Sequence, residues 1–177
     1  MELNNFMFEK WMLIDGYINY YVSNFGRVIN MTTKQILKPS ITSNGYKSVA
    51  LYSRVKKVFA VHRLVAFAFI DNYEKDRKNV DHKNHNKLDN NVNNLRWATT
   101  TENGQNRKKQ KNTKSIYKGV IWRKDRKVWV AKIMYNKHRI YLGSYKTQEE
   151  AGRAYNEKAI ELFGEFAKLN TFELNVA

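Results

Sequence analysis

The stretch VDHKNHNKLDNNVNNLRWATTTEN, residues 80–103, decides how the whole chain is interpreted. It holds two of the four histidines, two aspartates and many asparagines around one short run, Asn94-Leu95-Arg96-Trp97. Two explanations compete. Asn and Asp favour turns, so the stretch can be a polar loop. Alternatively, its oxygen and imidazole groups form a site that holds a hard cation and activates a water.

The residue pattern predicts a strand over 78–81, a long polar loop, and a partner strand over 94–97. A helix follows, opened by a capping box between Thr99 and Glu102. The preceding segment VHRLVAFAFI, residues 61–70, predicts a mostly buried helix.

In such a strand–loop–strand–helix order, the last helix carries Asn103 across the hairpin toward Asp81 and His82. A carboxylate and an amide oxygen make a hard-oxygen site suited to Mg²⁺ or Mn²⁺. His82 beside that cation is the natural general base, because imidazole titrates near neutral pH. The cation would stabilise the leaving oxygen of a phosphodiester.

With its Asp-His, Asn-Leu-Arg-Trp and Glu-Asn elements, the stretch resembles the HNH nuclease motif of phage and intron-encoded homing endonucleases. The resemblance implies that His82 activates the water and that Asp81 and Asn103 hold a single divalent cation. It also implies that Asn94 braces the loop that carries the histidine through hydrogen bonds. Asn103 stands where many of these proteins have the last histidine, so the chain has the H-N-N variant of the motif.

Other polar and aromatic residues in and near the motif have structural interpretations. We expect His85 to contact solvent or backbone, and His62 to be a hydrogen-bonded structural residue on the buried helix. Asp89 and Asn90 are expected to cap and shape the loop, and Trp97 to pack in the core beneath the site.

Charge points to the partner. Lys and Arg outnumber Asp and Glu by 32 to 16, which favours polyanions, with nucleic acid first and an anionic membrane surface second. Residues 107–153 carry 15 basic and 3 acidic side chains, whereas residues 81–106 carry 3 of each. This distribution fits a neutral reactive segment, residues 81–106, whose basic flanking segments bind the nucleic acid. Because the positive charge does not follow one amphipathic helix, a membrane-surface role is the weakest alternative.

The chain lacks the signals of secreted and membrane proteins. It has no cysteine, which excludes a disulfide framework and a thiolate zinc site. No apolar run approaches the ~20 residues that a bilayer span needs, and the first residues lack the order of a signal peptide. We expect a soluble protein in the cytoplasm of a bacterial or phage-infected cell.

The N-terminal segment predicts short strands and turns, with Asn44-Gly45 as the strongest hairpin signal. Residues 9–58 resemble the small nuclease-associated module that precedes such HNH cores, which implies DNA contact near the cleavage site. Arg27 and Lys47 are the candidate contacts.

The C-terminal segment predicts strands over 117–123, 127–135 and 139–145, followed by a helix that Thr147 caps. Residues 115–170 resemble the Apetala/ethylene-response DNA-binding domain, whose sheet reads the major groove. The resemblance assigns as base readers Lys118, Gly119, Ile121, Arg123, Lys132, Met134, Arg139 and Tyr141. Independently, a sheet face with Arg, Lys and aromatic side chains suits guanine edges and thymine methyls. Further DNA contacts are expected from Arg96, Arg107, Lys108 and Lys109.

The sequence thus predicts an α+β protein with four parts: an N-terminal β-rich module (1–58), a ββα-metal nuclease core (59–106), a basic linker (107–114) and the Apetala-like domain (115–177). We expect a site-specific homing endonuclease that needs Mg²⁺ or Mn²⁺ and acts as a monomer on an asymmetric duplex site. Two alternatives are a DNA-binding regulator with an inactive nuclease motif and a structure-specific or non-specific nuclease. A bounded footprint separates the homing enzyme from the last of these.

Overall fold

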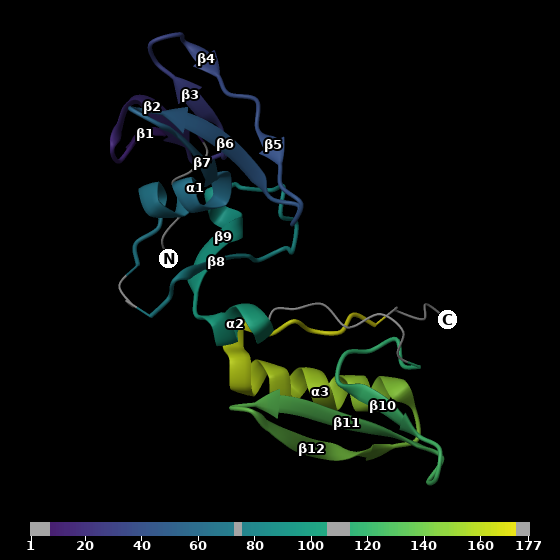
Figure 1. Ribbon diagram of the computed structural model, residues 1–177. Helices are drawn as coiled ribbons and strands as arrows, with labels where there is room; N and C mark the ends of the chain where they lie inside the picture. Colours follow the sequence, from purple (N-terminus) through teal and green to yellow (C-terminus); the bar gives the residue numbers. More distant parts are fainter. Residues whose placement is uncertain (1–7, 73–75, 106–113, 173–177) are drawn as a thin grey trace. The chain divides into compact units, whose positions relative to one another are not determined.

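The computed structural model describes residues 8–72, 76–105 and 114–172 (Figure 1). The chain forms two compact units, and the boundary between them in the sequence falls between Thr100 and Thr101. The first unit is β-rich and includes the strands of the nuclease core. The second unit contains a three-stranded sheet packed on one long helix. The mixed α and β class is confirmed, while the predicted boundaries at residues 58, 106 and 114 stay predictions.

Two antiparallel sheets form the first part of the first unit. The larger contains β1 (Trp11–Ile14), β2 (Tyr17–Ser23), β3 (Val28–Asn30) and β4 (Gln35–Ile36) in that order, and the smaller contains β5 (Ser40–Ile41), β6 (Lys47–Tyr52) and β7 (Lys56–Ala60). The expected turn at Asn44-Gly45 is present. Both this turn and the one at Gly26 need a glycine, since Gly26 and Gly45 have φ of +77° and +78°.

The rest of the first unit consists of α1 (Val61–Phe69), β8 (Asn79–His82), a 3₁₀ turn η1 (Val92–Asn94) and β9 (Leu95–Ala98). The strands β8 and β9 pair antiparallel, as expected. One hydrophobic core joins side chains from both sheets, α1, β8 and β9, including Val22, Leu51, Val65 and Leu95. The N-terminal sheets and the strands of the predicted nuclease core therefore fold around a shared interior.

The helix α2 (Thr100–Gln105) begins at the last residue of the first unit, and the rest of it belongs to the second. The second unit also contains β10 (Val120–Arg123), β11 (Val128–Tyr135), β12 (His138–Tyr145), α3 (Gln148–Phe163) and a 3₁₀ turn η2 (Gly164–Phe166). The strands pair antiparallel in the order β10-β11-β12, and α3 covers one face (Figure 1). The first strand begins later than predicted, at Val120, because Gly119 with φ of +77° turns the chain just before it.

The predicted N-terminal cap of α3 is confirmed. The Thr147 hydroxyl accepts the backbone N–H of Glu150 at 3.2 Å, and the Glu150 carboxylate accepts that of Thr147 at 3.0 Å. Gly164 is the C-cap. The inward face buries Ala151, Tyr155 and Ala159 against the sheet. None of the helices in the described ranges combines the length and apolar character needed to cross a bilayer.

Candidate active site and nucleic-acid interface

Asp81 and His82 lie at the end of β8, and both are almost fully buried, with 6% and 5% of their surface exposed. The register of the hairpin places Asp81 opposite Arg96 on β9. Arg96 donates from Nε and Nη2 to Asp81 Oδ2 at 3.0 and 2.8 Å. This buried ion pair fixes the carboxylate at the strand end. Arg96 is itself buried, so the DNA contact predicted for it stays a prediction and its observed partner is Asp81.

The His82 imidazole is held from the loop that follows it. Its Nε2 lies 3.0 Å from Oδ1 of Asn90, a residue only 3% exposed. With the proton on Nε2, the ring donates to the amide oxygen and the Nδ1 lone pair becomes the basic position. A general base needs this combination of a fixed ring and a fixed tautomer.

Two further rings surround His82. The centroid of the His62 ring lies 5.2 Å from that of His82, and the Tyr46 centroid lies 4.8 Å from His62 and 5.9 Å from His82. Burial, with a smaller contribution from His82, lowers the pKa of His62 to about 4, so this imidazole is neutral. Within the described part of the chain His62 Nδ1 has no hydrogen-bond partner, so the expected hydrogen bonding is absent at this nitrogen, and the ring packs against His82 and Tyr46.

Asn94 closes the loop between β8 and β9. Its Oδ1 accepts the backbone N–H of Asn84 at 3.0 Å, and its Nδ2 donates to the Asp89 carbonyl at 2.8 Å. The Asn94 carbonyl accepts the N–H of Lys83 at 2.8 Å. Asp89 Oδ2 accepts from the Asn84 amide at 2.7 Å. These hydrogen bonds therefore join the two sides of the loop. The role of Asn94 in catalysis stays a prediction.

The remaining residues of the motif have local structural contacts. The His85 backbone donates to the His82 carbonyl at 2.9 Å, and His85 itself has a positive φ of 62°. Trp97 is buried, as expected, and donates from Nε1 to the Ile70 carbonyl at 2.9 Å.

Asn103 lies on α2, in the second unit, whereas Asp81 and His82 belong to the first. Its convergence with them therefore stays a prediction. Among the residues described, no group of three or more His, Cys, Asp or Glu side chains gathers into a metal cluster. The predicted donor set is of another kind, a carboxylate with an amide oxygen, and its hard oxygens suit Mg²⁺ or Mn²⁺.

In the second unit, the sheet face opposite α3 bears most of the predicted base readers. Arg139 pairs with Met134, and Tyr141 pairs with Lys132, across β11 and β12. The residues between them, such as Ile133, are buried against α3. Met134 and Tyr141 are 52% and 59% exposed, and Ile121, Arg123 and Arg139 are exposed as well.

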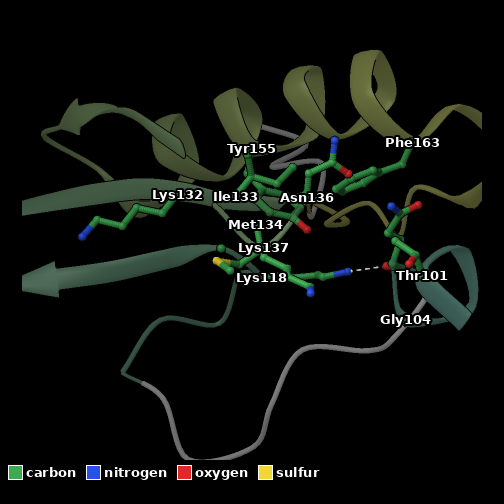
Figure 2. A pocket seen from close by; sticks show the side chains of 12 residues that line it. Thr101, Gly104, Lys118, Lys132, Ile133, Met134, Asn136, Lys137, Tyr155 and Phe163 are labelled. Atoms are coloured by element: carbon green, nitrogen blue, oxygen red, sulfur yellow. Dashed lines mark hydrogen bonds between the residues drawn. The ribbon is translucent and has the colours of Figure 1, made fainter. Parts of the chain in front are cut away.

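The other two predicted readers in the second unit, Lys118 and Gly119, line a cavity of about 360 Å³ together with Lys132 and Met134 (Figure 2). Lys118 donates from Nζ to the Gln105 carbonyl at 2.7 Å, and burial lowers its pKa to about 8. A Cβ at Gly119 would lie 2.0 Å from the Tyr155 ring, so close packing requires glycine there. Gly119 therefore has a structural task besides any contact with DNA.

The DNA contacts predicted outside this sheet differ in their surroundings. Arg27 pairs with Glu9 and lies over the Trp11 ring, 5.5 Å from its centroid. Lys47 is half-buried at the start of β6. Arg107, Lys108 and Lys109 lie outside the described residues.

Two family models match the first part of the chain. Residues 9–52 match the NUMOD4 motif, and residues 59–105 match the HNH endonuclease model. These matches support a DNA-cleaving hydrolase. The first match covers β1 to β6, and the second contains Asp81, His82 and Asn94 in the hairpin and Asn103 on α2.

Curated relatives support the same conclusion. The chain is 42% identical over 99 residues to DNA endonuclease I-HmuI of Bacillus phage SP01, covering 55% of this chain and 56% of the relative. It is 44% identical over 101 residues to an uncharacterized HNH endonuclease, L247, of Acanthamoeba polyphaga mimivirus, covering 54% of this chain and 25% of that protein. The chain thus spans about half or less of the length of these relatives.

A solved structure agrees as well. The structure described as "DNA binding and cleavage by the HNH homing endonuclease I-HmuI" matches with a TM-score of 0.52 at 41% identity, covering 55% of this chain and 56% of that one. Over that share, the fold is that of an HNH homing endonuclease.

Sequence reasoning missed three partners around Asp81 and His82. These are Tyr46, for which the sequence predicts no role, Arg96, for which we predict a DNA contact, and Asn90, which we expect to shape the loop. The contact of Tyr46 with His82 joins residues far apart in the chain, so no local sequence pattern predicts it. The pairing of Arg96 with Asp81 depends on the strand register, which a long loop does not fix.

Proposed function

We propose that this chain is a homing-type, site-specific DNA endonuclease that hydrolyses a phosphodiester bond with the help of one divalent cation, producing a nick or a double-strand break. One observation carries the proposal. Within the segment that matches the HNH endonuclease model, Asp81 and His82 lie side by side in the chain, buried at one strand end, and each is held by a partner side chain.

In the proposed reaction His82 is the general base. Its Nδ1 takes a proton from a water, and the water oxygen attacks the scissile phosphorus as the bond from phosphorus to the leaving oxygen breaks. Asn90 holds the opposite ring nitrogen, and Asn94 ties down the loop that follows the histidine. The base therefore reaches the reaction already oriented, which lowers the entropic part of the barrier.

Asp81 and Asn103 would hold the cation, Mg²⁺ or Mn²⁺, through carboxylate and amide oxygens. When bound, the cation neutralises charge on the scissile phosphate and stabilises the leaving oxygen. Arg96 acts on Asp81 as a positioning residue, because its two N–H groups fix Oδ2 and the direction of the carboxylate.

We assign DNA binding to the second unit, where the outer sheet face would read the major groove as in the Apetala/ethylene-response domains. Its exposed Arg139, Met134 and Tyr141 support this assignment. The N-terminal sheets would add contacts near the cut through Arg27 and Lys47, and the basic segment 107–109 would follow the phosphates. Two dissimilar arms on one chain suit a monomer on an asymmetric site, in the cytoplasm of a bacterial or phage-infected cell.

The test is incubation of the intact protein with a supercoiled plasmid that contains the genomic DNA flanking its own gene. We expect cleavage with Mg²⁺ or Mn²⁺, none with EDTA, and a bounded footprint on the cut region. A regulator with an inactive nuclease motif would give the footprint and leave the plasmid intact. A non-specific nuclease would cut without a bounded footprint.

A further inference from the structure

We infer that the turn Ser23–Arg27 of the N-terminal sheet is a positioning element for the general base, acting through Gly26 on Asn90 and through Asn90 on His82. The inference rests on the proposed nuclease function, because it gives this turn a task in the chemistry. It assigns to the N-terminal part a role in holding the active site, in addition to the DNA contact proposed above.

The turn is rigid by its own hydrogen bonds. The Ser23 N–H donates to the Arg27 carbonyl at 2.8 Å, and the Gly26 N–H donates to the Ser23 carbonyl at 2.9 Å. The Ser23 hydroxyl accepts the N–H groups of Phe25 and Arg27 at 3.3 and 3.1 Å. Since Ser23 is fully buried, these bonds hold one defined loop shape.

Asn24 joins this turn to the chain on both sides. Its buried side chain accepts the N–H of Lys10 at 2.7 Å and donates to the Phe8 carbonyl at 3.2 Å. Its carbonyl accepts the N–H of Val92, the first residue of η1, at 2.8 Å. The turn is therefore bonded to the backbone of the nuclease loop two residues after Asn90.

Gly26 lies directly against Asn90. A Cβ placed on Gly26 would lie 2.7 Å from the Asn90 Cβ and 3.1 Å from its carbonyl oxygen, so any larger residue would displace Asn90. Gly26 also has a φ of +77°, which favours glycine on its own account. The close approach and the turn conformation are separate reasons for glycine, and experiments can separate them.

Asn90 in turn positions the His82 ring. Its Oδ1 lies 3.0 Å from His82 Nε2, while its Nδ2 is buried and has no hydrogen-bond partner among the residues described. Burying the amide NH₂ group without a hydrogen-bond partner lowers the stability of the fold. The Asn90 side chain is thus explained by its contact with His82 rather than by bracing of the loop, for which Asn94 provides the bonds.

The first experiment compares Gly26→Ala with Gly16→Ala. Gly16 has a φ of +73° but nothing within 4 Å of an added Cβ, so its variant carries the same conformational strain without the contact. We expect Gly26→Ala to lower the single-turnover cleavage rate by about 10- to 100-fold with an unchanged DNA dissociation constant. Gly16→Ala should cleave at the wild-type rate. Equal losses in both variants would overturn the inference.

The second experiment compares Asn90→Asp with Asn90→Leu, which have similar size. Aspartate keeps an acceptor oxygen for the His82 N–H, and leucine does not. We expect Asn90→Asp to retain most of the cleavage rate and Asn90→Leu to lose it, even where both have the same melting temperature. A rate that falls equally in the two variants would contradict the acceptor role. This pair decides the matter if Gly26→Ala fails to fold.

A readout without DNA or metal separates this inference from the proposed function. Long-range ¹H–¹⁵N NMR reports the tautomer of each histidine ring at about pH 8, above the ordinary imidazole pKa, and His82→Gln assigns the His82 signal. We expect His82 in the Nε2–H form in the wild type, Gly16→Ala and Asn90→Asp, and a mixture in Gly26→Ala and Asn90→Leu. A His82 tautomer unaffected by Gly26→Ala and Asn90→Leu would overturn the inference, even for an active nuclease. An inactive wild type with the expected tautomers would refute the proposed function alone.

Discussion

The loop between β8 and β9 and the outer face of the second unit's sheet are both rich in polar side chains, and they use them in opposite ways. In the loop, Asn94, Asp89 and Asn84 bond to one another and to the backbone. On the sheet face, Arg139 and Tyr141 extend into solvent. In the proposed function, the fixed loop serves the chemistry and the exposed face binds the DNA.

Charge separates the same two regions. The segment 81–106 is balanced, whereas 107–153 carries 15 basic and 3 acidic side chains. Affinity for DNA should therefore come mainly from the second region, and fall steeply with salt, while the rate of cleavage depends on the first. Variants that separate binding from cleavage test this division.

The largest effect is expected for His82→Ala. Loss of a general base should lower the single-turnover rate at saturating DNA by about 10²- to 10⁴-fold and leave the DNA dissociation constant unchanged. His138→Ala, which removes an exposed histidine of β12, is the matched control and should cleave normally. Cleavage by His82→Ala at the wild-type rate would show that His82 is not the general base.

Next in size is Arg96→Met, measured by urea unfolding. The change removes the guanidinium that donates twice to the buried Asp81 carboxylate, and we expect a loss of about 3–5 kcal/mol. The double variant Asp81→Asn/Arg96→Met should recover part of that loss, because the carboxylate charge is gone as well. Equal stabilities of the single and double variants would show that the unpaired carboxylate charge is not the source of the loss.

On the open face, Arg139→Ala should weaken binding to the target by about 1–3 kcal/mol, the contribution of a good base contact. The cleavage rate at saturating DNA should not change. Lys124→Ala, in the exposed turn between β10 and β11, is the control and should alter binding less. A variant Arg139→Ala that bound normally but cut slowly would reverse the assigned roles.

The smallest effect concerns the helix behind that face. Thr147→Ala removes the capping box of α3 and should lower the unfolding free energy of the second unit by about 1 kcal/mol. Hydrogen exchange should show the loss in α3 and no change in β8 and β9. Equal loosening of both units would indicate that they do not unfold separately.

Local patterns predicted much of this molecule. The Thr147 capping box, the turn at Asn44-Gly45 and the strands around the Asp81-His82 pair depend on neighbours in sequence, which the sequence displays directly. The contacts that hold His82 could not be found this way. Tyr46 approaches His82, and Gly26 approaches Asn90, only because separate sheets share one core.

The contact of Arg96 with Asp81 is another that the local sequence does not show. The DNA contact predicted for Arg96 stays a prediction, whereas its burial depends on the hairpin register. An antiparallel pair with Arg96 opposite Asp81 puts the guanidinium on the carboxylate. A long loop of 12 residues between the strand ends does not specify that register from sequence.

The claim on which the account depends, that Asp81 and Asn103 share one cation, is tested most directly by Mn²⁺ titration followed by electron paramagnetic resonance. The titration uses His82→Ala protein on its target DNA, so that no cleavage occurs. We predict a single tight Mn²⁺ that Asp81→Asn and Asn103→Ala each weaken by at least about 10-fold, whereas Asn93→Ala, an exposed loop change, leaves the affinity intact. Wild-type Mn²⁺ affinity in the Asn103→Ala protein would contradict the account.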